Sequence, residues 1–360
     1  SSYAAWALMG ARAQGLFRFK QYAASSGLFV SVALLALAAP RAGSDVVAAM
    51  AGFAAANLAA ATWCAIDLPK ASRTNAARNL TSAEVKIIGP YATNAWLTSI
   101  VGSFVWARGE LAVVKGHLGE SAVGFYSVGL TLSGIINQAT ALLTGGLWPQ
   151  IARGWDKGDR ESVLRLSSFT TNLLMVVSGL SSGFVICFAP YIVALLFGQR
   201  FHESSRLVVI LALGPLALAS GSANLVLQAA TNGRFARDVT LAGGVTLFGA
   251  ALLLLPHFGI AGAAVARSAT QIVVAGSTLV WLGRVTGHDA RTRQNLRSFV
   301  LLVASAVGLV SAIALEPTIQ FAGRLTLFTA YGCLVCVICS PIRDAVTLRR
   351  LRGVVGSTLG

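Results

Sequence analysis

Long apolar segments recur along the whole chain, separated by short loops that hold most of the charged residues. A helix needs roughly 20 mainly apolar residues to cross a bilayer. On that basis the sequence predicts one partial and ten complete spans, and therefore an all-α polytopic membrane protein with about eleven transmembrane helices. The first predicted span is the partial one, so we expect the chain to be a fragment that begins inside a membrane helix. The predicted spans are residues 1–14, 22–40, 44–66, 87–107, 121–148, 166–188, 204–230, 236–256, 259–283, 297–315 and 320–342.

The composition favours a lipid environment over a water-facing surface. Hydrophobic residues make up 55% of the chain and charged residues only 11%, whereas soluble domains carry about 25% charged residues. The formal net charge of +15 could indicate a nucleic-acid partner. The basic residues are dispersed over short loops, however, and no basic helix with interleaved aromatic residues is present. We therefore expect the lipid bilayer, and no nucleic acid, as a partner.

Lys and Arg residues gather in alternate loops. Of the 28, 21 follow the first, third, fifth, seventh and ninth predicted spans or lie in the C-terminal tail, and six lie in the other loops. Cytoplasmic loops of membrane proteins carry the excess of Lys and Arg. The alternation predicts that the C-terminus is cytoplasmic, and it supports the order of the spans.

One basic residue, Arg267, lies deep inside a predicted span, away from either end. It stands about eight residues beyond Gly259, where that span begins, which is a depth of roughly 12 Å. A charged residue at such a depth normally faces a wet cavity or a partner. We expect Arg267 to bind an anionic group such as a phosphate, or to bond a neighbouring helix or the outer face. Gln271 follows one turn later on the same side.

Four amides also lie within predicted spans: Asn137, Gln138, Asn224 and Gln228. Amides in membrane helices either contact a polar substrate or hydrogen-bond to other helices, and both interpretations stay open.

A charged cluster of Arg108, Glu110 and Lys115 follows the predicted span 87–107. We expect it at the outer end of that span, as an exit rim, as a coupling site or as a solvated surface cluster. Glu110 is the one acid near a span that could take a coupling proton or cation.

The sequence predicts that the chain is not an enzyme. Its acids are few and lie mostly in loops beside Lys or Arg, and it has no DxD, HExxH or GxxxxGK[ST] motif. Catalysis at a metal or by general acid–base transfer requires such groups. We therefore predict no catalytic residue, no metal site and no cofactor.

Several segments together resemble a known transporter family. They are AQGLFRFKQYAASSG (13–27), GHLGESAVGFYSVGLTLSGIINQATALLTGGLWPQIAR (116–153), ALLFGQRFHESSRLVVILAL (194–213), NLVLQAATNGRFARD (224–238) and LLLLPHFGIAGAAVARSATQI (252–272). The chain resembles the polysaccharide and O-antigen flippases of the multidrug/oligosaccharidyl-lipid/polysaccharide exporter superfamily, with the N-terminal part missing. Arg267 departs from the pattern, which usually has a small or apolar residue there.

The resemblance implies two six-helix lobes around a central cavity, with an appended pair of C-terminal helices. It also implies alternating-access transport of an undecaprenyl-diphosphate-linked oligosaccharide across the bacterial inner membrane. The substrate would be the main partner, and glycan polymerase or ligase machinery a further one. The implied division is residues 1–66 for the last three helices of the N-lobe, 67–83 for a cytoplasmic linker, 84–283 for the C-lobe, 284–342 for a loop and the appended pair, and 343–360 for a cytoplasmic tail.

Three other functions remain open at this point. A drug/cation antiporter of the same superfamily would need carboxylates within the lobes, and the chain offers only Glu110 near an edge. A membrane-embedded polysaccharide polymerase or ligase would need a large outer loop with catalytic Arg or His. A scaffold for envelope assembly would show no transport.

Overall fold

The computed structural model describes residues 55–56, 58–59, 82–145, 147–287, 290–315 and 319–339. The chain forms two compact units, one of residues 1–86 and 145–150 and the other of residues 87–144 and 151–360. The second unit holds nearly all of the described residues and carries the candidate site. Every regular element in the described ranges is helical, which agrees with the predicted all-α class.

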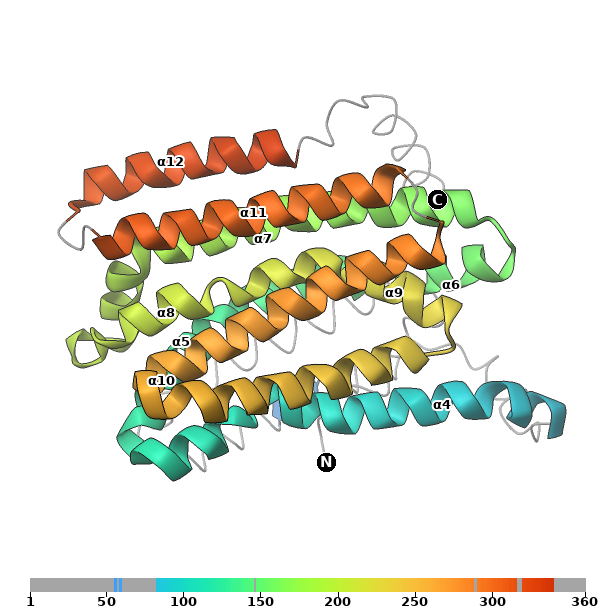
Figure 1. Ribbon diagram of the computed structural model, residues 1–360, viewed down its shortest axis with the longest axis horizontal. Coiled ribbons are helices and arrows are strands. Elements are labelled where there is room, and N and C mark those ends of the chain that lie inside the picture. The colour runs from blue at the N-terminus through green and yellow to red at the C-terminus, as the bar shows by residue number, and fades with distance from the viewer. Residues whose placement is uncertain are drawn as a thin grey trace. The chain divides into compact units, whose positions relative to one another are not determined.

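Most of the described helices are long (Figure 1). Three further stretches depart from α geometry. The α-helices are α4 (Ser82–Gly102), α5 (Glu110–Gly145), α6 (Trp148–Asp156), α7 (Arg160–Phe197), α8 (Ser204–Leu211), α9 (Gly221–Ala230), α10 (Arg234–Val285), α11 (Ala290–Leu315) and α12 (Phe321–Ile338). The departures are the π-helix η2 (Ser103–Arg108) and the 3₁₀-helices η3 (Gln199–Phe201) and η4 (Gly214–Ser220).

Six segments of the described chain are long and apolar enough to cross a membrane, so the chain is a multi-pass membrane protein by length and composition. They are Gly89–Asn137, Arg160–Phe197, Ser204–Ala230, Arg234–Val285, Ala290–Leu315 and Phe321–Ile338. The predicted count of about eleven helices is not supported. Two of the predicted spans, 1–14 and 22–40, lie outside the described residues, as does almost all of 44–66.

Two of the six segments each combine two predicted spans, because a glycine turns the chain inside a long helix. Gly119 in α5 (φ 83°, ψ −175°) and Gly259 in α10 (φ 58°, ψ −143°) have non-helical backbone angles. Positive φ is accessible to glycine at little cost. At Gly259 the helix doubles back, so the two halves of α10 form a hairpin (Figure 1). The predicted boundary between spans 236–256 and 259–283 falls on this turn.

The segment Ser204–Ala230 differs from the continuous span that the sequence predicts. It consists of α8, then the seven residues of η4, then α9. Runs of 3₁₀-helix longer than three or four residues are uncommon and often mark a functional hinge. Pro215 lies in η4 and cannot donate a backbone hydrogen bond. The middle of this segment is therefore an irregular backbone inside a bundle of membrane helices.

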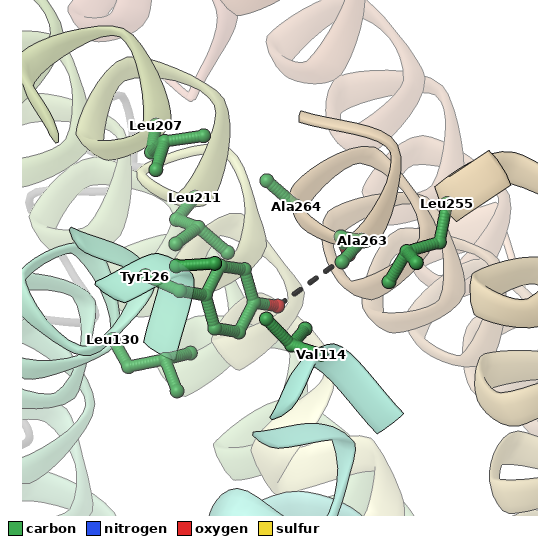
Figure 2. Packing of buried hydrophobic residues seen from close by; sticks show 9 residues of the cluster. Val114, Tyr126, Leu130, Leu207, Leu211, Leu255, Ala263 and Ala264 are labelled. Carbon is green, nitrogen blue, oxygen red and sulfur yellow. Dashed lines mark hydrogen bonds between the residues drawn. The ribbon is translucent and has the colours of Figure 1, made fainter. Parts of the chain in front are cut away.

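The second unit is built around α7 and α10. α7 packs against α8, η4, α9, α11 and α12, while α10 packs against η2, α8, η4, α9 and α11. A hydrophobic cluster joins α5, α8 and both halves of α10 (Figure 2). Its centre is Tyr126, which is fully buried and whose hydroxyl donates to the carbonyl of Ala263 at 3.4 Å. The other labelled members are Val114, Leu130, Leu207, Leu211, Leu255 and Ala264.

A buried arginine anchors α12 to α7. Nη1 of Arg324 donates to the carbonyl of Cys187 at 2.9 Å, and its Nε donates to the carbonyl of Ile319 at 3.1 Å. Arg324 is only 6% exposed, so this cation is buried between the helices. The predicted N-lobe, linker and tail lie almost wholly outside the described residues, so the division into lobes stays a prediction.

The cluster around Tyr126 gives the first testable prediction. Tyr126→Ala should lower the free energy of unfolding by about 3–5 kcal/mol, because it leaves a cavity between three helices. Tyr126→Phe should cost about 1 kcal/mol or less, because it removes a single long hydrogen bond. Unfolding in mixed micelles measures both. Phe258→Ala is the control, since Phe258 is 65% exposed, and equal losses for Tyr126→Ala and this control would contradict the packing.

Candidate functional site

A cavity of about 250 Å³ lies within the second unit, where the irregular helices η2 and η4 face α10. Irregular backbone at membrane depth is tolerated where it is buried in protein or lines a cavity. The wall of this cavity is formed by Thr98, Trp106, Asn137, Gly214, Ala217, Leu218, Ser220, Gly221, Asn224, Ala236, Val239, Thr240, Gln271, Val274, Ala275 and Thr278.

Three of the amides that the sequence singles out meet at this cavity. Asn137 comes from α5, Asn224 from α9 and Gln271 from the second half of α10. None of the three side chains makes a hydrogen bond within the part of the chain that the structure describes. An unpaired polar group away from water costs about 1–3 kcal/mol. The wall therefore presents amide donors and acceptors that are available to a polar ligand or to water.

The hydroxyl groups on the wall complement these amides. Thr98, Ser220 and Thr278 each donate to a carbonyl of their own helix, at 2.8 Å in every case. Their oxygen lone pairs then remain as acceptors. Alanine, valine and leucine side chains and the indole of Trp106 supply the apolar part of the wall. Binding sites for small molecules combine an apolar lining with a few placed polar groups in this way.

Gln271 reaches the wall because Gly214 has no side chain. A Cβ atom at position 214 would overlap Oε1 of Gln271. The neighbouring Ser268 donates to the carbonyl of Ile210 at 2.8 Å, which holds α10 against the end of α8. Gly214, the first residue of η4, and Ser268 on α10 together position the Gln271 amide at the cavity wall.

A buried ion pair lies beside the cavity. Nη1 of Arg267 donates to Oε1 of Glu110, and its Nη2 donates to the backbone carbonyl of Trp106 at 2.8 Å. The two side chains are only 7% and 1% exposed. Arg267 precedes Gln271 by one turn of α10, but it is not part of the cavity wall. In this conformation its guanidinium binds a carboxylate and a carbonyl, so an anionic substrate would have to compete with Glu110.

The structure divides the predicted charged cluster. Glu110 is buried in the pair with Arg267, whereas Lys115 is exposed and pairs with Glu120 at 2.9 Å. The exposure of Lys115 is compatible with a rim as well as with a solvated surface, so the roles of Lys115 and Glu110 stay predictions. The side chains of Arg108 and Gln138 lie outside the described set.

Gln228 shares a helix with Asn224 but does not line the cavity. It is half-buried, one turn closer to the end of α9. Sequence reasoning also overlooked Trp106 and the wall hydroxyls. Pro215, in the middle of a predicted span, was the one signal that the backbone departs from a regular helix there.

Comparison with known proteins gives a weak but consistent result. No protein-family model matches the chain. The chain is similar to the probable low-salt glycan biosynthesis flippase Agl15 of Haloferax volcanii, with 24% identity over 176 residues. The match covers 48% of this chain and 37% of that protein, so the chain spans little more than a third of the curated relative. The similarity supports a flippase-like protein in general.

The ion pair gives the second prediction. Arg267→Met should lower the free energy of unfolding by about 3–5 kcal/mol, because it leaves the carboxylate of Glu110 buried without its cation. Adding Glu110→Met should recover most of that loss, since two apolar side chains can replace a buried pair at little cost. Lys115→Met, which breaks the exposed pair, should change stability little. A double variant as unstable as Arg267→Met alone would contradict the pairing.

Proposed function

We propose that the chain belongs to a flippase that moves a lipid-linked glycan across a membrane, and that the cavity between η2, η4 and α10 contacts sugar. The observation that carries the proposal is the convergence of three amides on one cavity within a bundle of apolar helices. Each has no partner in the described residues. Hydrophobic packing alone gives no reason to place Asn137, Asn224 and Gln271 there, because each amide is costly to desolvate.

The chemistry of the wall fits a neutral, hydroxyl-rich ligand. Amides both donate and accept hydrogen bonds, as sugar hydroxyls do. The described wall residues include no Lys, Arg, Asp or Glu. The volume of about 250 Å³ is below the range of about 300–1,000 Å³ typical of sites for drug-sized ligands. A single sugar ring is a ligand of suitable size.

The similarity to a probable glycan biosynthesis flippase supports the same function from an independent direction. The finer parts of the proposal come from the family resemblance of the sequence. They are an undecaprenyl-diphosphate carrier, alternating access, location in the bacterial inner membrane with a cytoplasmic C-terminus, and glycan polymerase or ligase machinery as a further partner. The diphosphate would bind elsewhere than the cavity wall, or would displace Glu110 from Arg267.

The proposal is one of transport without catalysis. The described wall offers no carboxylate, imidazole or thiol to act as a general acid, a base or an activated nucleophile. An antiporter for cations is less well supported, because the carboxylate that could bind the coupling ion, Glu110, is already neutralised by Arg267.

The third prediction compares two amides on α9. Asn224→Ala should weaken glycan binding and slow translocation about two- to tenfold, because a hydrogen bond to an uncharged group contributes roughly 0.5–1.5 kcal/mol. Gln228→Ala should leave both unchanged, since this amide is off the wall. The measurement is movement of a fluorescent lipid-linked oligosaccharide across proteoliposome membranes.

Protein-free vesicles give the background rate for this assay. Translocation no faster than that background would overturn the proposed function. Normal translocation with equal effects of the two substitutions would remove the cavity from the transport pathway while leaving transport itself in place.

A further inference from the structure

We propose that Arg267 is a positioning residue of the cavity, which holds the π-helical turn of η2 so that Trp106 forms part of the sugar-binding wall. This inference rests on the proposed function, because it concerns the same cavity. It assigns Arg267 a role different from contact with an anionic substrate.

η2 is a π-helical turn between α4 and α5. A π-helical turn in a longer helix inserts an extra residue, and such turns are frequent at functional sites. Here the turn covers Ser103–Arg108 and leads directly into Gly109 and α5. A Cβ atom at position 109 would overlap the carbonyl of Phe104 and would lie 3.2 Å from the ring of Phe248. The turn is therefore compact only because position 109 is glycine.

One guanidinium, that of Arg267, bonds this segment on both sides of Gly109. Nη2 of Arg267 binds the Trp106 carbonyl, and Nη1 binds the Glu110 carboxylate. The guanidinium is planar, with its donors in a fixed fork. The two bonds together fix how far apart the carbonyl and the carboxylate lie. A lysine ammonium at the end of a flexible stem would not impose that separation.

Trp106 connects the Arg267 hydrogen bonds to the cavity wall. The backbone of Trp106 bonds Arg267, while its side chain lines the cavity. The indole packs closely on α10, since a Cβ atom at Gly243 would lie 2.7 Å from its Cζ2 atom. Gln271, which also lines the cavity, follows Arg267 by one turn of the same helix. Arg267 thus joins the segment that carries the Trp106 indole to the helix that carries the Gln271 amide.

The role of Trp106 follows from general chemistry. An aromatic face packs against the C–H groups of a sugar ring, while amides fix the direction of its hydroxyl groups. Both surfaces must lie at the correct separation for a ring to contact them together, and a shift on the order of 1 Å is large on that scale. Loss of the Arg267 fork would therefore weaken binding through Trp106.

The test is a double-mutant cycle between Arg267→Lys and Trp106→Phe, in the whole chain held in lipid nanodiscs. The probes are the methyl glycosides of glucose, galactose and N-acetylglucosamine, titrated by saturation-transfer NMR. We expect Arg267→Lys to weaken binding about tenfold in the presence of Trp106, and less than twofold in the Trp106→Phe background. A purely structural role would give equal losses in both backgrounds, and that result would overturn the inference.

Arg324→Lys is the matched control. Arg324 is equally buried and also donates to backbone carbonyls, but it lies on α12 and does not line the cavity. We expect this substitution to leave sugar affinity unchanged. A tenfold loss here too would show that any buried lysine perturbs the bundle, and it would overturn the inference.

Two further measurements distinguish this inference from the proposed function. If the unsubstituted chain binds none of the glycosides, the cavity's assignment to sugar fails. The positioning role is then tested by the emission of Trp106, taken as the difference from the Trp106→Phe variant. A shift in Arg267→Lys but not in Arg324→Lys supports positioning, and unchanged emission overturns it. If Arg267→Lys does not fold, Glu110→Gln takes its place in the cycle, with an expected loss of about threefold that disappears without Trp106.

Discussion

A guanidinium and a carboxylate buried together between the α4–α5 segment and α10 decide how the second unit is arranged. Neither charge could remain inside an apolar bundle alone, because the desolvation cost of each ion is several kcal/mol. Arg267 and Glu110 are 157 residues apart in the chain and meet with almost no exposure to solvent or lipid. The pair joins the second half of α10 to the turn that carries Trp106. Gln271 and Trp106, one on each of the joined segments, line the same cavity.

Two of the three departures from α geometry, η2 and η4, border that cavity. In a regular membrane helix the backbone satisfies its own hydrogen bonds, and only side chains are presented to neighbours. The π turn departs from that regularity, and the carbonyl of Trp106 within it accepts from Arg267. The 3₁₀ stretch narrows the helix at Gly214 and leaves room for a glutamine. The cavity lies where both helices are irregular, between regular segments that hold it in place.

The sequence predicts the parts of this structure that depend on local physics. Apolar length predicts the membrane-crossing helices, and Arg267 is recognisable as costly because of its depth in a span. The partner of Arg267 is not predictable in this way, because the predicted span 87–107 places Glu110 at the membrane edge and cannot show a π turn. Asn224 and Gln228 appear equivalent, since they share a helix face. The two amides lie about 6 Å apart along the axis of α9. Only the tertiary packing determines that Asn224 lines the cavity and Gln228 does not. The convergence of Asn137, Asn224 and Gln271 likewise depends on contacts between distant segments.

The modest volume of the cavity has a consequence for the length of glycan that such a transporter could accept. A cavity of about 250 Å³ holds roughly one sugar ring. Any further rings of the glycan would lie outside the reach of its hydrogen-bonding groups. The cavity would then discriminate between ligands by the identity and stereochemistry of one sugar ring. The number of rings attached to that ring would not affect binding in the cavity. If this cavity binds sugar as proposed, the ring inside it is selected, and the cavity itself sets no limit on the rings that lie outside it.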